Sequence, residues 1–239
     1  MRPARLAPLL LAALLATGCL QSSPGGDPRT PAPGGPAPPA DASLVAANAE
    51  FAMRLSRTLA AQAPDANLFL SPLGVSMAFA MAYESASGEA RAEMARAFGF
   101  DALAPGGLAG ANRALLDNLS ARREVALDVA NAFWMRDSFA PRVNAGYVET
   151  LRTSYRSEVE TADFSDPATV DRINAWASES TRGKVPRVLD RIGPGEVALL
   201  LDAVYFQGNW THPFRPHCTR DAPFARQDGS VSTVRMMCG

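Results

Sequence analysis

Apolar side chains recur at steps of three and four residues in the first stretch of the chain with a regular pattern. One stripe consists of Leu44, Ala47, Phe51, Leu55 and Leu59. This spacing predicts an amphipathic helix over about residues 43–62, capped by Asp41 or Ser43 and ended by Pro64.

Further helices follow the first. One is predicted over about residues 72–84, where Ser71 can act as N-cap and Pro72 occupies the first turn. This stretch is apolar on nearly all sides, so we expect it to be buried. Other helices are predicted over residues 87–97, 142–153 and 167–181. Asp166 can cap the last of these, which should lie across the sheet.

Three stretches have the pattern of β-strands. Residues 67–70 form a short apolar run. Over residues 125–135 apolar positions alternate, and Asn131 is a polar break in the apolar face. Residues 197–206 are almost continuously apolar, which is typical of a strand covered on both faces, and Asp202 interrupts them. A buried amide or carboxylate without a hydrogen bond costs about 1–3 kcal/mol.

The end of the chain predicts a hairpin. Asp228 and Gly229 form a strong turn signal, and Cys218 and Cys238 lie at equal distances from residue 228. In an antiparallel hairpin the two cysteines would face each other, which suits a disulfide in an oxidising compartment. Closing this loop would contribute about 3 kcal/mol. The alternative is two free thiols.

The N-terminus has the pattern of a bacterial lipoprotein signal peptide. Arg2 and Arg5 precede a short apolar run that ends near Ala16, and Cys19 follows Gly18. We expect residues 1–18 to be removed and Cys19 to carry lipid; the alternative is an ordinary secretory leader. Residues 19–42, rich in Pro and Gly, would then be a tether, and residues 43–239 the folded domain. The protein would be anchored in the bacterial cell envelope, facing the periplasm or the exterior.

Composition and charge exclude several function classes. The chain has 239 residues, 47% of them hydrophobic, and a formal charge of −1, which gives no reason to expect a nucleic-acid partner. The only histidines, His212 and His217, lie in one loop and make a weak metal site without further ligands. The sequence contains no phosphate-binding loop and no hydrolase motif, so we expect no cofactor, no metal and no enzymatic activity.

Two blocks of sequence resemble the serpin (serine protease inhibitor) family. The first is Asn67-Leu-Phe-Leu-Ser-Pro72 with the apolar helix after it, and the second spans residues 171–214. The positions that carry the resemblance in the second block are Asn174, Trp176, Thr181, Gly183, Lys184, Phe206, Gly208 and Trp210. The likeness extends over about residues 43–239. It implies an α+β fold in which helices pack on a large, mostly antiparallel sheet.

The resemblance also implies a function. Serpins inhibit proteases with a loop near their C-terminus, and that loop would lie beyond Gly239, so no reactive-site bond is expected in this chain. We expect that the C-terminal part of the domain is missing. The expected partner is a serine or cysteine protease, and the protein is expected to be a monomer.

Serpins further have a polar cluster that helps control opening of the main sheet. The resemblance assigns Ser71, Asn131 and Asp202 to this cluster. Gly74 stands where a second serine is usual, and Asp202 stands where asparagine is usual. We therefore expect Asp202 to be protonated or paired. The alternative is an ordinary core carboxylate whose hydrogen bonds are satisfied.

Two other functions stay open. One is a non-inhibitory serpin-like lipoprotein that binds a ligand at the cell surface. The other is an inactive fragment, because strands near residues 125–136 and 231–237 would expose unpaired edges.

Overall fold

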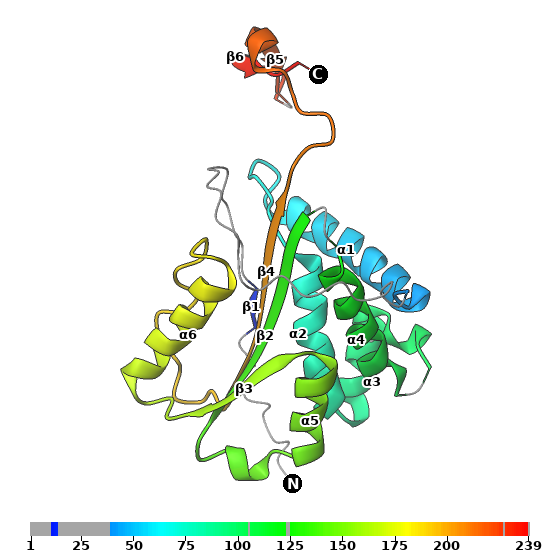
Figure 1. Ribbon diagram of the computed structural model, residues 1–239, viewed down its shortest axis with the longest axis vertical. Coiled ribbons are helices and arrows are strands. Elements are labelled where there is room, and N and C mark those ends of the chain that lie inside the picture. The colour runs from blue at the N-terminus through cyan, green and yellow to red at the C-terminus, as the bar shows by residue number, and fades with distance from the viewer. Residues whose placement is uncertain (1–10, 14–38, 105, 123–124, 227, 239) are drawn as a thin grey trace. The chain divides into compact units, whose positions relative to one another are not determined.

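The computed structural model describes residues 11–13, 39–104, 106–122, 125–226 and 228–238. The chain forms two compact units, which divide between Phe206 and Gln207. The first unit contains helices and a four-stranded sheet, so the α+β class expected from the sequence is confirmed (Figure 1).

Four of the described helices of the first unit begin at a residue whose side chain caps them, and these residues are Asp41, Ser71, Asn144 and Asp166. Asp41 accepts hydrogen bonds from the N–H groups of Ser43 and Leu44 at 2.8 and 3.1 Å, and so starts the first helix. Asp166 does the same for the last helix. The helices are α1 (Ala42–Gln62), α2 (Pro72–Ser85), α3 (Gly88–Phe98), α4 (Gly107–Ser120), α5 (Ala145–Ser154) and α6 (Pro167–Ser180), with short 3₁₀ turns at Phe100–Ala102 and Ala140–Arg142.

The sheet of the first unit has the strand order β1-β4-β2-β3. Its strands are β1 (Leu11–Ala13), β2 (Val125–Arg136), β3 (Ser157–Ala162) and β4 (Ala198–Gly208). β2 and β3 pair in parallel because α5 carries the chain back between them, and β1 and β4 also pair in parallel. The N–H of Arg136 donates to the carbonyl of Val197 at 2.9 Å, so the end of β2 meets the start of β4 and these two strands are antiparallel. Among the described residues the four strands thus combine two parallel pairs with one antiparallel pair.

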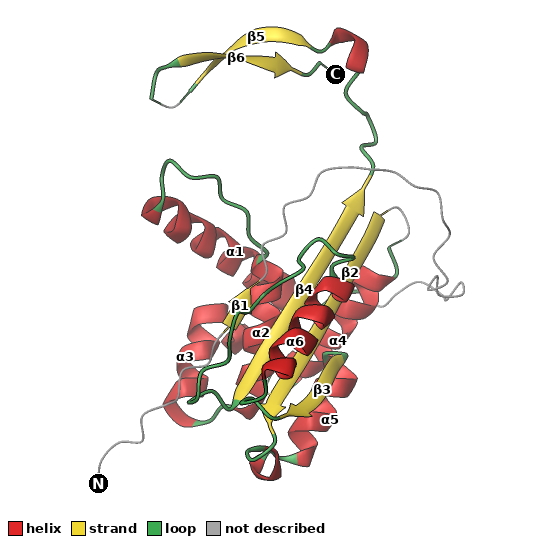
Figure 2. Cartoon of the chain, turned by 90° about the vertical axis from the view of Figure 1, so that its left-hand side faces the viewer, coloured by secondary structure: helices red, strands yellow, loops and turns green. Residues whose placement is uncertain are grey.

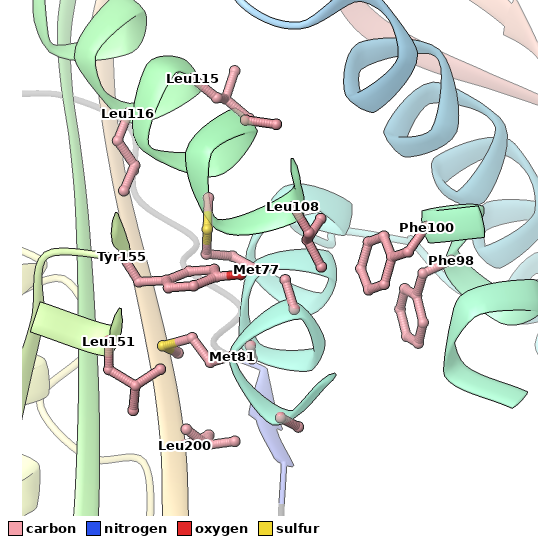
Figure 3. Packing of buried hydrophobic residues seen from close by; sticks show 14 of the residues in the cluster. Met77, Met81, Phe98, Phe100, Leu108, Leu115, Leu116, Leu151, Tyr155 and Leu200 are labelled. Atoms are coloured by element: carbon pink, nitrogen blue, oxygen red, sulfur yellow. The ribbon is translucent and has the colours of Figure 1, made fainter. Parts of the chain in front are cut away.

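The sheet is covered on both faces (Figure 2). Trp134 of β2 and Leu201 of β4 belong to the hydrophobic cluster that includes α6, which confirms that this helix lies across the sheet. Leu200 points to the opposite face, where α2 and the helices around it form the larger core. In that core Met77 and Met81 of α2 lie beside Tyr155 and Leu151 (Figure 3). Two-sided burial explains the continuous apolar run of β4.

One prediction for local structure was wrong, and two elements were not predicted. Residues 67–70 do not form a strand, and Phe69 is 54% exposed; a strand needs a partner, and none lies beside this stretch among the described residues. The helix α4 was not predicted, although its leucines recur with helical spacing. The strand β3, in which Glu158 and Glu160 alternate with other residues, was also not predicted.

The second unit contains a hairpin. After a 3₁₀ turn at Pro216–Cys218, β5 (Arg220–Ala225) and β6 (Val231–Met236) pair antiparallel. Gly229 has a φ of 80° in the connecting turn, a value that favours glycine.

Candidate functional site

The candidate site is the polar cluster of Ser71, Asn131 and Asp202. It lies between β4, β2 and the first turn of α2. Ser71 is the N-cap of α2, and its Oγ accepts a hydrogen bond from the N–H of Gly74 at 3.2 Å. A Cβ atom at position 74 would lie less than 3.0 Å from Oδ1 of Asp202 and 3.3 Å from Oγ of Ser71. Real Cβ atoms essentially never come within 3.0 Å of a neighbour. Gly74 therefore leaves the space into which the Asp202 carboxyl extends.

Asn131 completes this cluster from β2. The register set by the bond between Arg136 and Val197 places Asn131 opposite Asp202 in the antiparallel pair. The side chain of Asn131 is 1% exposed, and its Nδ2 donates to the carbonyl of Tyr155 at 2.9 Å. That bond fixes the amide orientation, so Oδ1 is the atom left to interact elsewhere.

Two oxygen atoms of the cluster are buried without a hydrogen-bond partner among the described residues. They are Oδ1 of Asn131 and Oδ2 of Asp202. An ionised carboxylate and an amide oxygen are both acceptors, so they cannot bond to each other. Burial raises the pKa of Asp202 from 3.8 to about 7, because removal from water penalises the charged form. A neutral carboxyl is thus accessible near neutral pH.

Two tyrosines join α2 to the chain segment of α5. The hydroxyl of Tyr155 donates to Oε1 of Glu84 at 2.8 Å, and that of Tyr147 donates to the carbonyl of Met81 at 3.1 Å. Burial raises the pKa of Tyr147 to about 12 and that of Tyr155 further, so both hydroxyls stay neutral donors. The role of Tyr155 leaves no signal in the sequence, since its contact with Asn131 uses only the backbone carbonyl.

A cavity of about 810 Å³ lies in the same unit, near the end of α2. Apolar side chains dominate its lining, and Glu84 and Arg142 are the charged residues in it. The apolar residues with the largest side chains in this lining are Met94, Phe133, Phe139, Tyr147 and Leu200.

A second group of predicted positions secures the loop after α6. Asn174 accepts from the N–H groups of Val188 and Leu189 at 2.7 and 3.1 Å and donates to the Leu189 carbonyl at 2.9 Å. Thr181 is 1% exposed; it donates to the carbonyl of Ala177 at 2.8 Å and accepts from another backbone N–H. These side chains replace the regular backbone bonds that an irregular loop lacks.

The other predicted positions lie elsewhere. Gly183, with a φ of 77°, follows the end of α6, and Trp176 is buried on that helix, while Lys184 is exposed. Phe206 is 66% exposed and Trp210 is 75% exposed, and Gly208 is the last residue of β4. Phe206 does not join the polar cluster.

The remaining predicted positions lie in the second unit or outside the described residues. Cys218 and Cys238 are joined as a disulfide, with their Cα atoms 5.9 Å apart. His212 and His217 are exposed, and no group of three or more metal-binding side chains comes together in the part of the chain that the structure describes. Cys19 lies outside that part. Within it, no helix combines the length and apolar character needed to cross a membrane.

Comparison with known proteins gives a consistent result. Residues 46–239 match the family model described as Serpin (serine protease inhibitor). The chain is 30% identical to corticosteroid-binding globulin of Oryctolagus cuniculus, covering 90% of this chain and 55% of that protein. It is 32% identical to the leukocyte elastase inhibitor of Bos taurus, covering 81% and 52%. The chain thus spans about half the length of the curated relatives it matches.

Solved structures with a similar fold also match the chain. The structure of cleaved kallistatin complexed with heparin superimposes with a TM-score of 0.72 at 25% identity, covering 80% of this chain and 57% of that one. The structure of tengpin, a thermophilic serpin in the latent state, gives a TM-score of 0.68 over 81% of this chain and 51% of that one.

Proposed function

The chain belongs to the serpin family, and on that premise we propose that the whole protein inhibits a serine or cysteine protease. In the proposed mechanism the protease cuts an exposed loop, and the cut loop adds to the central sheet as a new strand. The attached protease is then displaced and trapped. Relatives named as elastase inhibitors support this choice. The presence of this loop in the whole protein is also part of the proposal.

The observation that carries the proposal is the edge of β4. β4 is packed on both faces, and its residues Leu200–Asp202 pair with the leader residues Leu11–Ala13 in the structure. Removal of residues 1–18, as the leader pattern predicts, leaves this edge without a partner among the described residues. An unpaired strand edge is a template for strand addition. The polar cluster lies beside this edge.

Trapping of a protease can be tested directly. The whole protein is incubated with trypsin-, chymotrypsin- and elastase-like serine proteases and with a papain-like cysteine protease. We expect an adduct that survives boiling in detergent, with the summed mass of the two proteins less the C-terminal peptide that the cut releases. The control is the same protease with its nucleophile blocked, which should give no adduct. Cleavage without any adduct for all proteases would contradict inhibition.

A second candidate function is ligand binding without inhibition. The cavity of about 810 Å³ falls within the range of small-molecule sites, roughly 300–1,000 Å³, and its lining is mainly apolar. A relative named for binding corticosteroids supports an apolar ligand. Saturable binding of an apolar fluorescent probe that Leu200→Trp abolishes, with no protease adduct, would favour this function.

We also propose that the protein is anchored through lipid on Cys19 and faces the periplasm or the exterior of a bacterial cell. The leader pattern and the Pro- and Gly-rich residues 19–42 support this proposal. The test is partitioning into a detergent phase. We expect the unaltered protein in that phase and Cys19→Ala outside it, and equal partitioning would contradict the anchor.

A further inference from the structure

The two partnerless oxygens of the polar cluster belong to residues that face each other across two strands. Asn131 on β2 and Asp202 on β4 lie opposite each other on the face that packs against α2. Opposite side chains in an antiparallel pair are about 4.5–5.5 Å apart at Cβ, within hydrogen-bonding reach of their ends. Because both oxygens are acceptors, a hydrogen bond between them requires a proton on one of them.

We propose that Asp202 is a carboxylic acid in the folded protein and donates its proton from Oδ2 to Oδ1 of Asn131. A hydrogen bond that joins β4 to β2 then depends on pH. The bond satisfies both buried oxygens at once, whereas ionisation leaves both unsatisfied and adds a buried charge. The cluster acts as a pH-dependent latch between the two strands.

The groups that face Asp202 from the neighbouring elements cannot ionise. α2 contributes Ser71 and Gly74, β2 contributes Asn131, and β1 pairs Ala13 with Asp202. No basic side chain among the described residues compensates a negative charge at this position. Tyr155 reaches the cluster only through its backbone carbonyl, which bonds to Asn131, whereas its hydroxyl donates to Glu84 near the C-terminal end of α2. The hydroxyl of Tyr147 likewise bonds to α2 at Met81.

The electrostatics of Asp202 agree with a neutral acid. Its side chain is buried, and burial alone accounts for the rise of its pKa to about 7. Because the folded pKa lies above the unfolded value of 3.8, protonation stabilises the folded state. This contribution is fully present below the unfolded pKa and is lost as pH rises through about 7.

The consequence for activity rests on the proposed function. The proposed mechanism requires the sheet to accept a new strand beside β4. The hydrogen bond from Asp202 to Asn131 holds β4 more firmly to β2. We therefore expect spontaneous loss of inhibitory activity during storage to be faster at about pH 8 than at about pH 6, and slower at about pH 8 in Asp202→Asn. Protease adducts test inhibition, and thermal unfolding tests the latch. The latch can therefore be tested even if the protein does not inhibit a protease.

The first test compares thermal unfolding of the whole protein with that of Asp202→Asn. The amide cannot ionise and can donate to Asn131 at every pH. We expect the Tm of the variant to gain about 5 °C over the unaltered protein between about pH 5 and about pH 8. The matched control is Asp128→Asn on β2, whose carboxylate is about half exposed and pairs with Arg182 at 2.8 Å. This control should not gain Tm as pH rises. A constant or shrinking difference for Asp202→Asn would overturn the latch.

The second test does not require a substitution of Asp202. Infrared spectra of the protein labelled with ¹³C in aspartate carboxyl groups should show a protonated acid at about pH 6 that disappears by about pH 8. Asn131→Ala should move this band to the frequency of an acid without a hydrogen-bond acceptor. Absence of the band at about pH 6, or a band that Asn131→Ala leaves in place, contradicts the proposal.

Discussion

Gly74 and Asp202 are complementary in space: the hydrogen that glycine has in place of a side chain leaves the room that the Asp202 carboxyl occupies. A Cβ atom on residue 74 would come within 3.0 Å of Oδ1 of Asp202. Gly74 lies in the first turn of α2 and Asp202 in the middle of β4, so the two departures from the usual serpin residues form one structural feature.

This relationship predicts that Gly74→Ala destabilises the protein. Overpacking against the carboxyl should cost about 1–3 kcal/mol, in spite of the better helix propensity of alanine. The measurement is the free energy of unfolding in denaturant. The matched control is Gly110→Ala in α4, where nothing lies within 4 Å of the new Cβ, and this change should be neutral or stabilising by up to about 1 kcal/mol.

A double variant tests whether the cost at position 74 arises from Asp202. In the background of Asp202→Ala, the change Gly74→Ala should cost less by at least about 1 kcal/mol, because the atoms that it would contact are gone. Equal costs in the two backgrounds would show that some other contact of α2 limits position 74.

The hydrogen bonds of Asn174 to the loop after α6 predict that Asn174→Ala destabilises the protein. Replacing it with alanine leaves two backbone N–H groups and one carbonyl without their partner, so we expect a loss of about 3 kcal/mol in the free energy of unfolding. Asp171→Ala on the exposed side of the same helix is the control and should change stability by no more than about 0.5 kcal/mol. A loss below about 1 kcal/mol for Asn174→Ala would mean that the loop is held by other contacts.

The hairpin of the second unit predicts a redox-dependent mass and stability. Intact mass should rise by about 2 Da on reduction, because a bridge between Cys218 and Cys238 takes up two hydrogens. The double variant Cys218→Ser/Cys238→Ser should show no such change and should lose about 3 kcal/mol of stability if the second unit unfolds together with the rest. An unchanged mass of the unaltered protein would exclude the bridge.

The sequence predicted the elements whose physics is local. The helix of Leu44 and Phe51, the cap at Ser71 and the apolar strand around Leu200 follow from periodicity, capping and two-sided burial. The helix α4 was within reach of the same reasoning, since Leu108, Leu115 and Leu116 share one buried face. Pairing was less predictable, because whether residues 67–70 become a strand depends on a partner far away in the sequence.

The candidate site was predictable only in part. The resemblance to serpins named Ser71, Asn131 and Asp202, and it marked Gly74 and Asp202 as departures. It could not reveal that Gly74 leaves the space that the Asp202 carboxyl occupies, because this needs the distance between α2 and β4. The contact of Asn131 with the Tyr155 carbonyl was also hidden, since any residue type can supply a backbone carbonyl.

The most direct test of the proposed mechanism is the Tm of the whole protein before and after limited proteolysis at the exposed loop that this mechanism requires. If the sheet accepts the cut loop beside β4, new strand pairing forms and stored strain is released, so the cleaved protein should unfold at a clearly higher temperature. Cleaved and uncleaved samples must be shown by mass to differ only in the cut bond. A cleaved protein with an unchanged or lower Tm would contradict strand insertion, and with it inhibition by the serpin mechanism.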